Sequence, residues 1–121
     1  MRMSELEYAA YLHRRGQRST SADAVLTEAG LVEHIRALAK RGGFLCYHTH
    51  DSRKSEPGFP DLVMTNGRRL LCWEVKTSTG KLTVAQARWL ALLERVPGVD
   101  ARVVRPQDLG AIEGWLRGEG V

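Results

Sequence analysis

The sequence predicts one α/β domain in which a small mixed β-sheet is flanked by helices. Short apolar runs separated by turn residues occupy residues 44–76, and apolar residues at spacings of three and four occur on both sides of this region. The chain has 121 residues, which is enough for one hydrophobic core and too few for two. A hydrophobic content of 43% and a charged content of 26% are typical of globular proteins.

The N-terminal residues 1–20 are expected to form a helical appendage, and residues 21–121 the main domain. Ser4 and Glu7 have the spacing of a capping box, which predicts a helix from there to about Arg15. This helix can be an ordinary solvated one, or it can pack on the core, on a partner subunit or on DNA.

Residues 22–41 are predicted to form a longer helix. Its apolar positions cluster on one side of a helical wheel and are Leu31, Val32, Ile35, Leu38 and Ala39. Glu28 projects into the middle of this cluster, so we expect it to face the core, whereas Glu33 points to the opposite side and is expected to face solvent. Glu28 is therefore the better candidate for an acid aimed at a site, with Glu33 as the alternative.

The middle of the chain predicts three strands. Residues 44–48 form an apolar run, residues 49–60 are a polar loop, and Asn66-Gly67 is a hairpin signal between the runs 62–65 and 70–76. Because side chains alternate across a strand, Glu74 and Lys76 share one face of the last run. Both faces of this run begin apolar, which favours a central position in the sheet.

The remaining elements are a helix, a strand and a helix. Thr83 and Gln86 form a second capping box, which predicts a helix to residues 93–95. The positions expected to reach the core from this segment are Leu82, Ala85, Trp89, Leu92 and Leu93. Residues 101–104 read as a strand that joins its neighbour in parallel through a right-handed crossover, and a last helix begins near Pro106.

The predicted hairpin places two acids at the same end of the sheet. Asp61 opens its first strand and Glu74 closes its second, so antiparallel pairing can bring the carboxylates together. Two hard oxygen ligands suit Mg²⁺ or Mn²⁺. Lys76 can then hold an attacking water or neutralise charge that develops on a phosphate.

Two segments resemble a known nuclease family. Pro60-Asp61 followed by Glu74-Val75-Lys76 is similar to the PD-(D/E)XK nuclease signature, and the longer pattern from Gly58 to Leu62, with Gly80-Lys81-Leu82-Thr83-x-x-Gln86, resembles the VRR-NUC branch. The resemblance extends from about Glu28 to Asp108. It implies a restriction-endonuclease-like core and a divalent-metal-dependent phosphodiesterase that acts on branched or flap DNA, often as a homodimer.

The resemblance also implies roles for individual residues. Asp61 and Glu74 would be metal ligands together with the carbonyl oxygen of Val75, and Glu28 would bind the metal directly or through water. Lys76 would orient and help deprotonate the nucleophilic water. Gln86 would assist Lys76 in this role, although the capping box alone explains the presence of a glutamine at this position equally well.

A basic net charge of +4 favours a polyanionic partner such as DNA. The candidate contacts to the DNA backbone are His48, Ser52, Arg53, Lys54 and Lys81. An ordinary solvated charge run explains the loop residues as well, and His48 can instead be satisfied by a backbone carbonyl at a strand end.

Other classes of protein fit the sequence less well. No apolar run approaches the length needed to span a bilayer and the N-terminus has no signal-peptide core, so a cytoplasmic protein without a membrane partner is expected. Cys46 and Cys72 lie in apolar strands without zinc-ligand spacing and are expected to be free thiols. A non-catalytic DNA-binding module, a small interaction protein, and a nicking or flap nuclease subunit of a larger assembly remain as alternatives to a Holliday junction or flap endonuclease.

Overall fold

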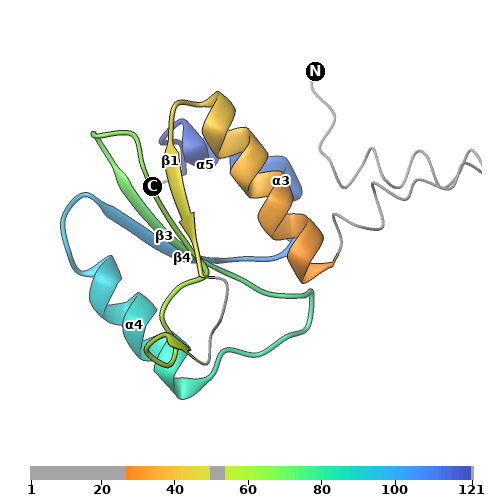
Figure 1. The fold of residues 1–121 in the computed structure, drawn as a ribbon, viewed down its shortest axis with the longest axis vertical. Coiled ribbons are helices and arrows are strands. Elements are labelled where there is room, and N and C mark those ends of the chain that lie inside the picture. Colours follow the sequence, from red (N-terminus) through yellow and green to blue (C-terminus); the bar gives the residue numbers. More distant parts are fainter. Residues whose placement is uncertain (1–26, 50–53, 121) are drawn as a thin grey trace, which may run out of the picture.

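The computed structural model describes residues 27–49 and 54–120, which form a four-stranded sheet with helices on both faces (Figure 1). The predicted helix at residues 4–15 lies outside these residues. The elements in chain order are α3 (Glu28–Arg41), β1 (Leu45–His48), β2 (Leu62–Thr65), β3 (Leu70–Val75), α4 (Val84–Glu94), β4 (Val99–Val104), the 3-10 helix η2 (Pro106–Asp108) and α5 (Leu109–Leu116).

The sheet is mixed, as the sequence predicts. Its strand order is β1-β2-β3-β4, with antiparallel pairing among the first three strands and parallel pairing of β3 with β4. The expected interior position of β3 and the parallel crossover are therefore confirmed. The turn between β2 and β3 is longer than the two-residue hairpin signal suggested, because Asn66 Oδ1 accepts hydrogen bonds from the backbone N–H groups of Arg68 and Arg69.

The hydrophobic core lies between the sheet and the helices α3 and α5. Leu71, Trp73 and Val75 of β3 are fully buried there, together with the predicted apolar stripe of α3. Trp73 packs edge-on against Trp115 of α5 with ring centroids 6.0 Å apart. Figure 1 shows α3 and α5 together on one side of the sheet and α4 on the other.

Helix α4 covers its face of the sheet sparsely, which differs from our expectation. Leu90 is its buried residue, whereas Leu92, which the helical pattern assigned to the core, is 55% exposed. The reason is that, among the described elements, α4 packs mainly against β4 and β3. Its capping box is as predicted: the Thr83 side chain accepts from the Gln86 N–H, and the Gln86 side chain accepts from the Thr83 N–H.

A buried charged cluster connects the sheet to α5. Asp100 of β4 is 7% exposed and accepts hydrogen bonds from Arg69 and from both ends of the Arg102 guanidinium group. Arg69 also donates to the carbonyl oxygens of Trp115 and Leu116, and Arg102 lies over the Trp115 ring at 4.1 Å. The buried carboxylate is thus fully compensated. None of the described helices has the length and apolarity needed to cross a membrane.

Gly58 brings the segment before β2 into direct contact with α4. Its φ of +85° is in the left-handed region, and a Cβ atom there would lie 2.4 Å from the Ala85 carbonyl carbon and 2.6 Å from the Gln86 nitrogen. Only glycine therefore allows the backbone of the Pro60-Asp61 segment to rest on the first turn of α4.

We predict that Gly58→Ala lowers the free energy of unfolding by roughly 3 kcal/mol, because it adds overpacking against backbone atoms to the cost of a positive φ. Gly67→Ala is the matched control, since Gly67 has a φ of +89° and open space around its Cβ position. It should cost about 1 kcal/mol. Urea unfolding of both variants measures the difference, and equal losses would refute the proposed contact.

Candidate active site

Asp61 and Glu74 meet at one end of the sheet, as the hairpin predicts. Asp61 directly precedes β2, and its Oδ2 accepts a hydrogen bond of 2.8 Å from the backbone N–H of Val75. Pro60, immediately before it, is fully buried. The acid is therefore fixed from both sides, by the buried proline of its own chain and by the last residue of β3.

Glu74 is a buried acid, and one of its two carboxylate oxygens accepts no hydrogen bond from the described residues. It is 3% exposed, and its Oε2 accepts a hydrogen bond of 3.0 Å from Nε2 of Gln86. The ammonium group of Lys76 lies 4.0 Å from the same oxygen. Its Oε1 is buried and has no hydrogen-bond partner among the described residues. An unsatisfied buried carboxylate oxygen is costly unless a further group binds it.

The electrostatics of this pair favour a bound cation or proton. Burial raises the pKa of Glu74 to about 8, and the nearby charge of Asp61 acts in the same direction, while Lys76 opposes the shift. Without a cation, Glu74 thus keeps a proton near neutral pH. This is the behaviour of two carboxyl groups that compete for one positive charge.

The residues present fit a divalent cation at this position. Asp61 and Glu74 supply hard oxygen ligands, and the unpartnered Oε1 of Glu74 is the atom that a cation would satisfy. Among residues 27–49 and 54–120 no group of three histidine, cysteine or acidic side chains is close enough to hold a metal. The two acids would therefore need backbone oxygen or water to complete the coordination.

The orientation expected for Glu28 is wrong. Glu28 is the first residue of α3 and is exposed, because the buried stripe of this helix begins only at Leu31. The alternative acid, Glu33, is also exposed and forms an ion pair with Arg36 at 2.9 Å. A role of Glu28 in metal binding stays a prediction.

Gln86 combines the two functions that the sequence left as alternatives. Its Oε1 accepts from the backbone N–H of Thr83 at 2.9 Å, and its Nε2 donates to Glu74. The cap thus fixes the rotamer that reaches the acid. One side chain ties the start of α4 to the end of β3.

The predicted DNA contacts surround this end of the sheet only in part. His48 ends β1 and pairs in register with Leu62, the residue after Asp61. Lys54 and Lys81 are exposed. Ser52 and Arg53 lie outside the described residues. Their roles in binding DNA stay predictions.

The supporting roles of two residues were not found from the sequence, which assigned Trp89 only to the core. Trp89 is half-buried, contacts Phe59 edge-on at 5.1 Å and donates from its indole N–H to the carbonyl oxygen of Pro57. Arg105 donates to the carbonyl oxygens of Thr77 and Gly80 at 2.8 and 2.7 Å, which fixes the turn after Lys76. A tryptophan at a helical spacing gives no signal of such a contact, and neither does a lone arginine after a strand.

A solved structure is similar to part of this chain. The chain is 26% identical to Hjc from Archaeoglobus fulgidus, described as a Holliday junction resolvase from an archaeal hyperthermophile. The superposition has a TM-score of 0.44 and covers 62% of this chain and 68% of Hjc. No curated protein matches the chain.

The VRR-NUC domain model matches residues 5–108. The match begins closer to the N-terminus than the resemblance in the motifs and includes most of residues 1–20, whose status as an appendage stays a prediction. It also covers the segment from Gly58 to Gln86, in which the acid pair, the lysine and the glutamine lie together. The protein therefore belongs to the VRR-NUC family of the PD-(D/E)XK nuclease superfamily.

Proposed function

We propose that the protein is a divalent-metal-dependent endonuclease that hydrolyses phosphodiester bonds in branched DNA as a homodimer. The observation that carries this proposal is the pair of half-buried Asp61 and buried Glu74. Glu74 Oε1 has no partner among the described residues, and the Lys76 ammonium group lies 4.0 Å from Glu74 Oε2. An acid pair that competes for positive charge at the end of a sheet is suited to hold Mg²⁺ or Mn²⁺.

The side chains of this end of the sheet divide the chemistry among them. Asp61, Glu74 and the carbonyl oxygen of Val75 would hold the cation, which supplies Lewis acidity toward the scissile phosphate. The Val75 N–H and the Gln86 amide keep the two carboxylates in place through hydrogen bonds. Lys76 would position the attacking water and offset the negative charge that develops on the phosphate.

Cutting both strands of a branched substrate requires two catalytic centres, and the part of one chain that the structure describes has one such acid pair. A symmetric dimer supplies the second centre. Hydrolysis of a four-way junction or a flap by such a dimer is the substrate class that we propose.

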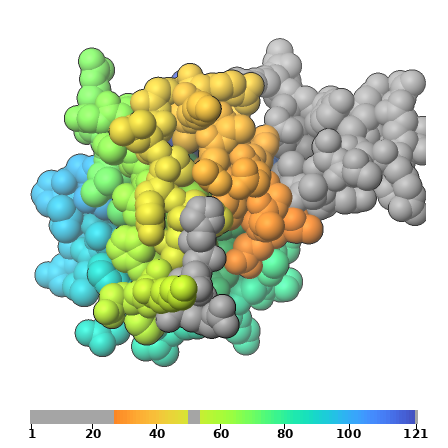
Figure 2. Space-filling model, in the orientation of Figure 1, coloured from red at the N-terminus to blue at the C-terminus, as the bar shows by residue number. Residues whose placement is uncertain are grey.

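An apolar surface on the α4 side of the sheet supports dimer formation. Cys46 of β1 packs against the core, so its neighbours Leu45 and Tyr47 point to the other face, where they are 79% and 61% exposed. Leu92 and Val96 of the α4 segment are 55% and 49% exposed. β1 is an edge strand at the surface of the face seen in Figure 2. Leu45 and Tyr47 lie on a strand that is at the edge of the described sheet, and exposed apolar side chains at such an edge and on a helix surface are features of an interface.

Removal of single functional groups tests the proposed chemistry. Asp61→Asn keeps an oxygen that can accept from Val75 but loses the charge, and Lys76→Met keeps most of the side-chain volume. Each is expected to reduce cleavage of a labelled four-way or flap substrate by at least about 10³-fold in Mg²⁺, with DNA affinity changed by less than about threefold.

The matched control is Glu33→Gln, which removes an exposed acid on the side of α3 that faces away from the core. This variant is expected to cleave DNA at the wild-type rate. Loss of DNA binding in Asp61→Asn or Lys76→Met with unchanged turnover of bound DNA would contradict the assignment. Cleavage of all substrates without any divalent ion would contradict the metal requirement.

The stability of the protein is expected to fall as pH rises from about 5 to 8 in EDTA. The pKa of Glu74 is raised to about 8 in the folded protein from 4.5, so the folded state holds a proton that the unfolded state releases within this window. Glu74→Gln mimics the protonated acid and should remove this loss, giving a gain on the order of 2 kcal/mol at pH 8.5 and none at pH 4.

Urea unfolding at both pH values measures this effect, and addition of Mg²⁺ or Mn²⁺ at pH 8.5 should stabilise the wild type but not Glu74→Gln. Glu33→Gln serves again as the control with an exposed carboxylate. Equal pH profiles of wild type and Glu74→Gln would show that this acid is ionised in the folded protein.

The dimer is tested by charge placed on the apolar surface. Light scattering of the wild type is expected to give twice the 13.5 kDa chain mass. Leu92→Glu should give the monomer mass, because burial of a carboxylate in an apolar interface is unfavourable. Ala87→Glu is the control, since Ala87 is exposed about 140° around the same helix. A dimer that persists in Leu92→Glu would place the interface elsewhere.

A further inference from the structure

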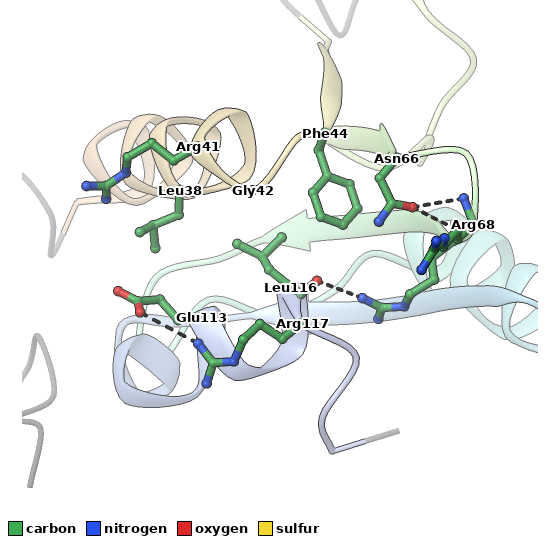
Figure 3. A pocket seen from close by; sticks show the side chains of 10 residues that line it. Leu38, Arg41, Gly42, Phe44, Asn66, Arg68, Glu113, Leu116 and Arg117 are labelled. Atoms are coloured by element: carbon green, nitrogen blue, oxygen red, sulfur yellow. Dashed lines mark hydrogen bonds and ion pairs between the residues drawn. The ribbon is translucent and has the colours of Figure 1, made fainter.

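A pocket of about 620 Å³ lies at the end of the sheet opposite the acid pair. It is formed by the C-terminal end of α3, the turn between β2 and β3, and the last turn of α5 (Figure 3). Arg69, directly before β3, is five residue steps from Glu74, which corresponds to about 17 Å along the strand.

The rim of this pocket is rich in arginine. Arg41, Arg68 and Arg117 are exposed there, and Glu113 is the acid among the lining residues. Arg117 is compensated by Glu119 at 2.8 Å and by Glu113 at 3.9 Å. The guanidinium groups of Arg41 and Arg68, in contrast, make no ion pair or hydrogen bond with any residue of the described ranges. Within the described part of the chain, two positive charges at the rim are therefore uncompensated.

Helix ends explain only part of this charge. α3 ends at the pocket, and a helix C-terminus carries about half a negative charge, so a cation such as Arg41 in the last turn is favourable there. Arg68 belongs to no helix, because it lies in the turn after β2. Among the described residues neither a helix dipole nor an acid compensates this arginine, so its charge is open to a negatively charged ligand.

The shape of the pocket favours an extended anion over a small one. Figure 3 shows Arg68 beside Asn66, Arg117 below, and the Arg41 side chain extending along α3 away from Phe44, so the guanidinium groups do not converge on one point. Phe44 and Leu116 lie between them and are 5% and 8% exposed. Cations spread around a shallow, largely apolar floor suit successive phosphates of a nucleic-acid strand, with sugar rings between the charges.

We infer that this arginine-rimmed pocket binds the sugar-phosphate backbone of the DNA substrate at a distance from the scissile bond. A separation of about 17 Å equals about five base-pair steps of B-DNA, so the two ends of one sheet can contact the same duplex arm. This inference rests on the proposed function. It adds a second point of contact with the DNA. Two contacts along one duplex arm fix the orientation of that arm relative to the acid pair.

The test is DNA binding at several salt concentrations, with Ca²⁺ in place of Mg²⁺ and the Lys76→Met background to prevent cleavage. The double variant Arg41→Ala/Arg68→Ala should bind a duplex or a four-way junction on the order of tenfold more weakly at 0.1 M salt. The slope of log K against log salt should fall by about one for each phosphate that the variant no longer neutralises. Circular dichroism melting checks that the variant is folded.

Two controls separate a local contact from a change in overall charge. Arg41→Lys/Arg68→Lys keeps both charges and should retain a slope near that of the parent. Arg95→Ala removes an exposed arginine after α4, on the other side of the sheet, and should change the slope by less than each pocket arginine does. An unchanged slope in the double alanine variant, or the same loss per charge in Arg95→Ala, would overturn the inference. A parent protein that binds no DNA would overturn the proposed function as well.

Discussion

The candidate site depends on the hydrogen bond between the Val75 N–H and the Asp61 carboxylate. This contact joins the residue before β2 to the last residue of β3, so it sets the distance between the two acids. It places Asp61 close enough to raise the pKa of Glu74, whose side chain is already buried. A sheet end that holds two carboxyl groups in this way is unstable toward deprotonation, and it gains stability when a proton or a cation binds.

Contacts of the surrounding loops hold the two segments that carry the acids in place, so the carboxyl groups cannot move apart toward solvent. Gly58 lets the chain before Asp61 lie directly on the backbone of α4, and Trp89 holds the same segment through the carbonyl oxygen of Pro57. On the other side, Arg105 binds two carbonyl oxygens of the turn that follows Lys76. Each of the two segments that carry the acids is thus anchored by a residue that lies far from it in sequence.

This division between local and distant contacts explains what the sequence could predict. The hairpin, the capping box and the convergence of Asp61 with Glu74 follow from turn chemistry and from the two-residue period of strands, and the structure confirms them. The exposure of Glu28 and Leu92 could not be predicted, because a helical period shows which residues share a side but not where the buried stripe ends or whether a neighbour covers it. Contacts of Trp89 depend on tertiary packing alone.

The two ends of the sheet differ in charge, with the acid pair at one end and uncompensated arginines of the described residues at the other. Without a cation, Glu74 keeps its proton near neutral pH and Asp61 carries the negative charge of the pair, which repels an approaching DNA phosphate. A cation held between the acids removes this repulsion, and cation binding and DNA binding must then strengthen each other to the same degree. At the other end, Arg41 and Arg68 attract the backbone without a cation. The arrangement allows the arm to bind first through the arginines, so that the scissile bond enters the acid pair only when its charge is compensated.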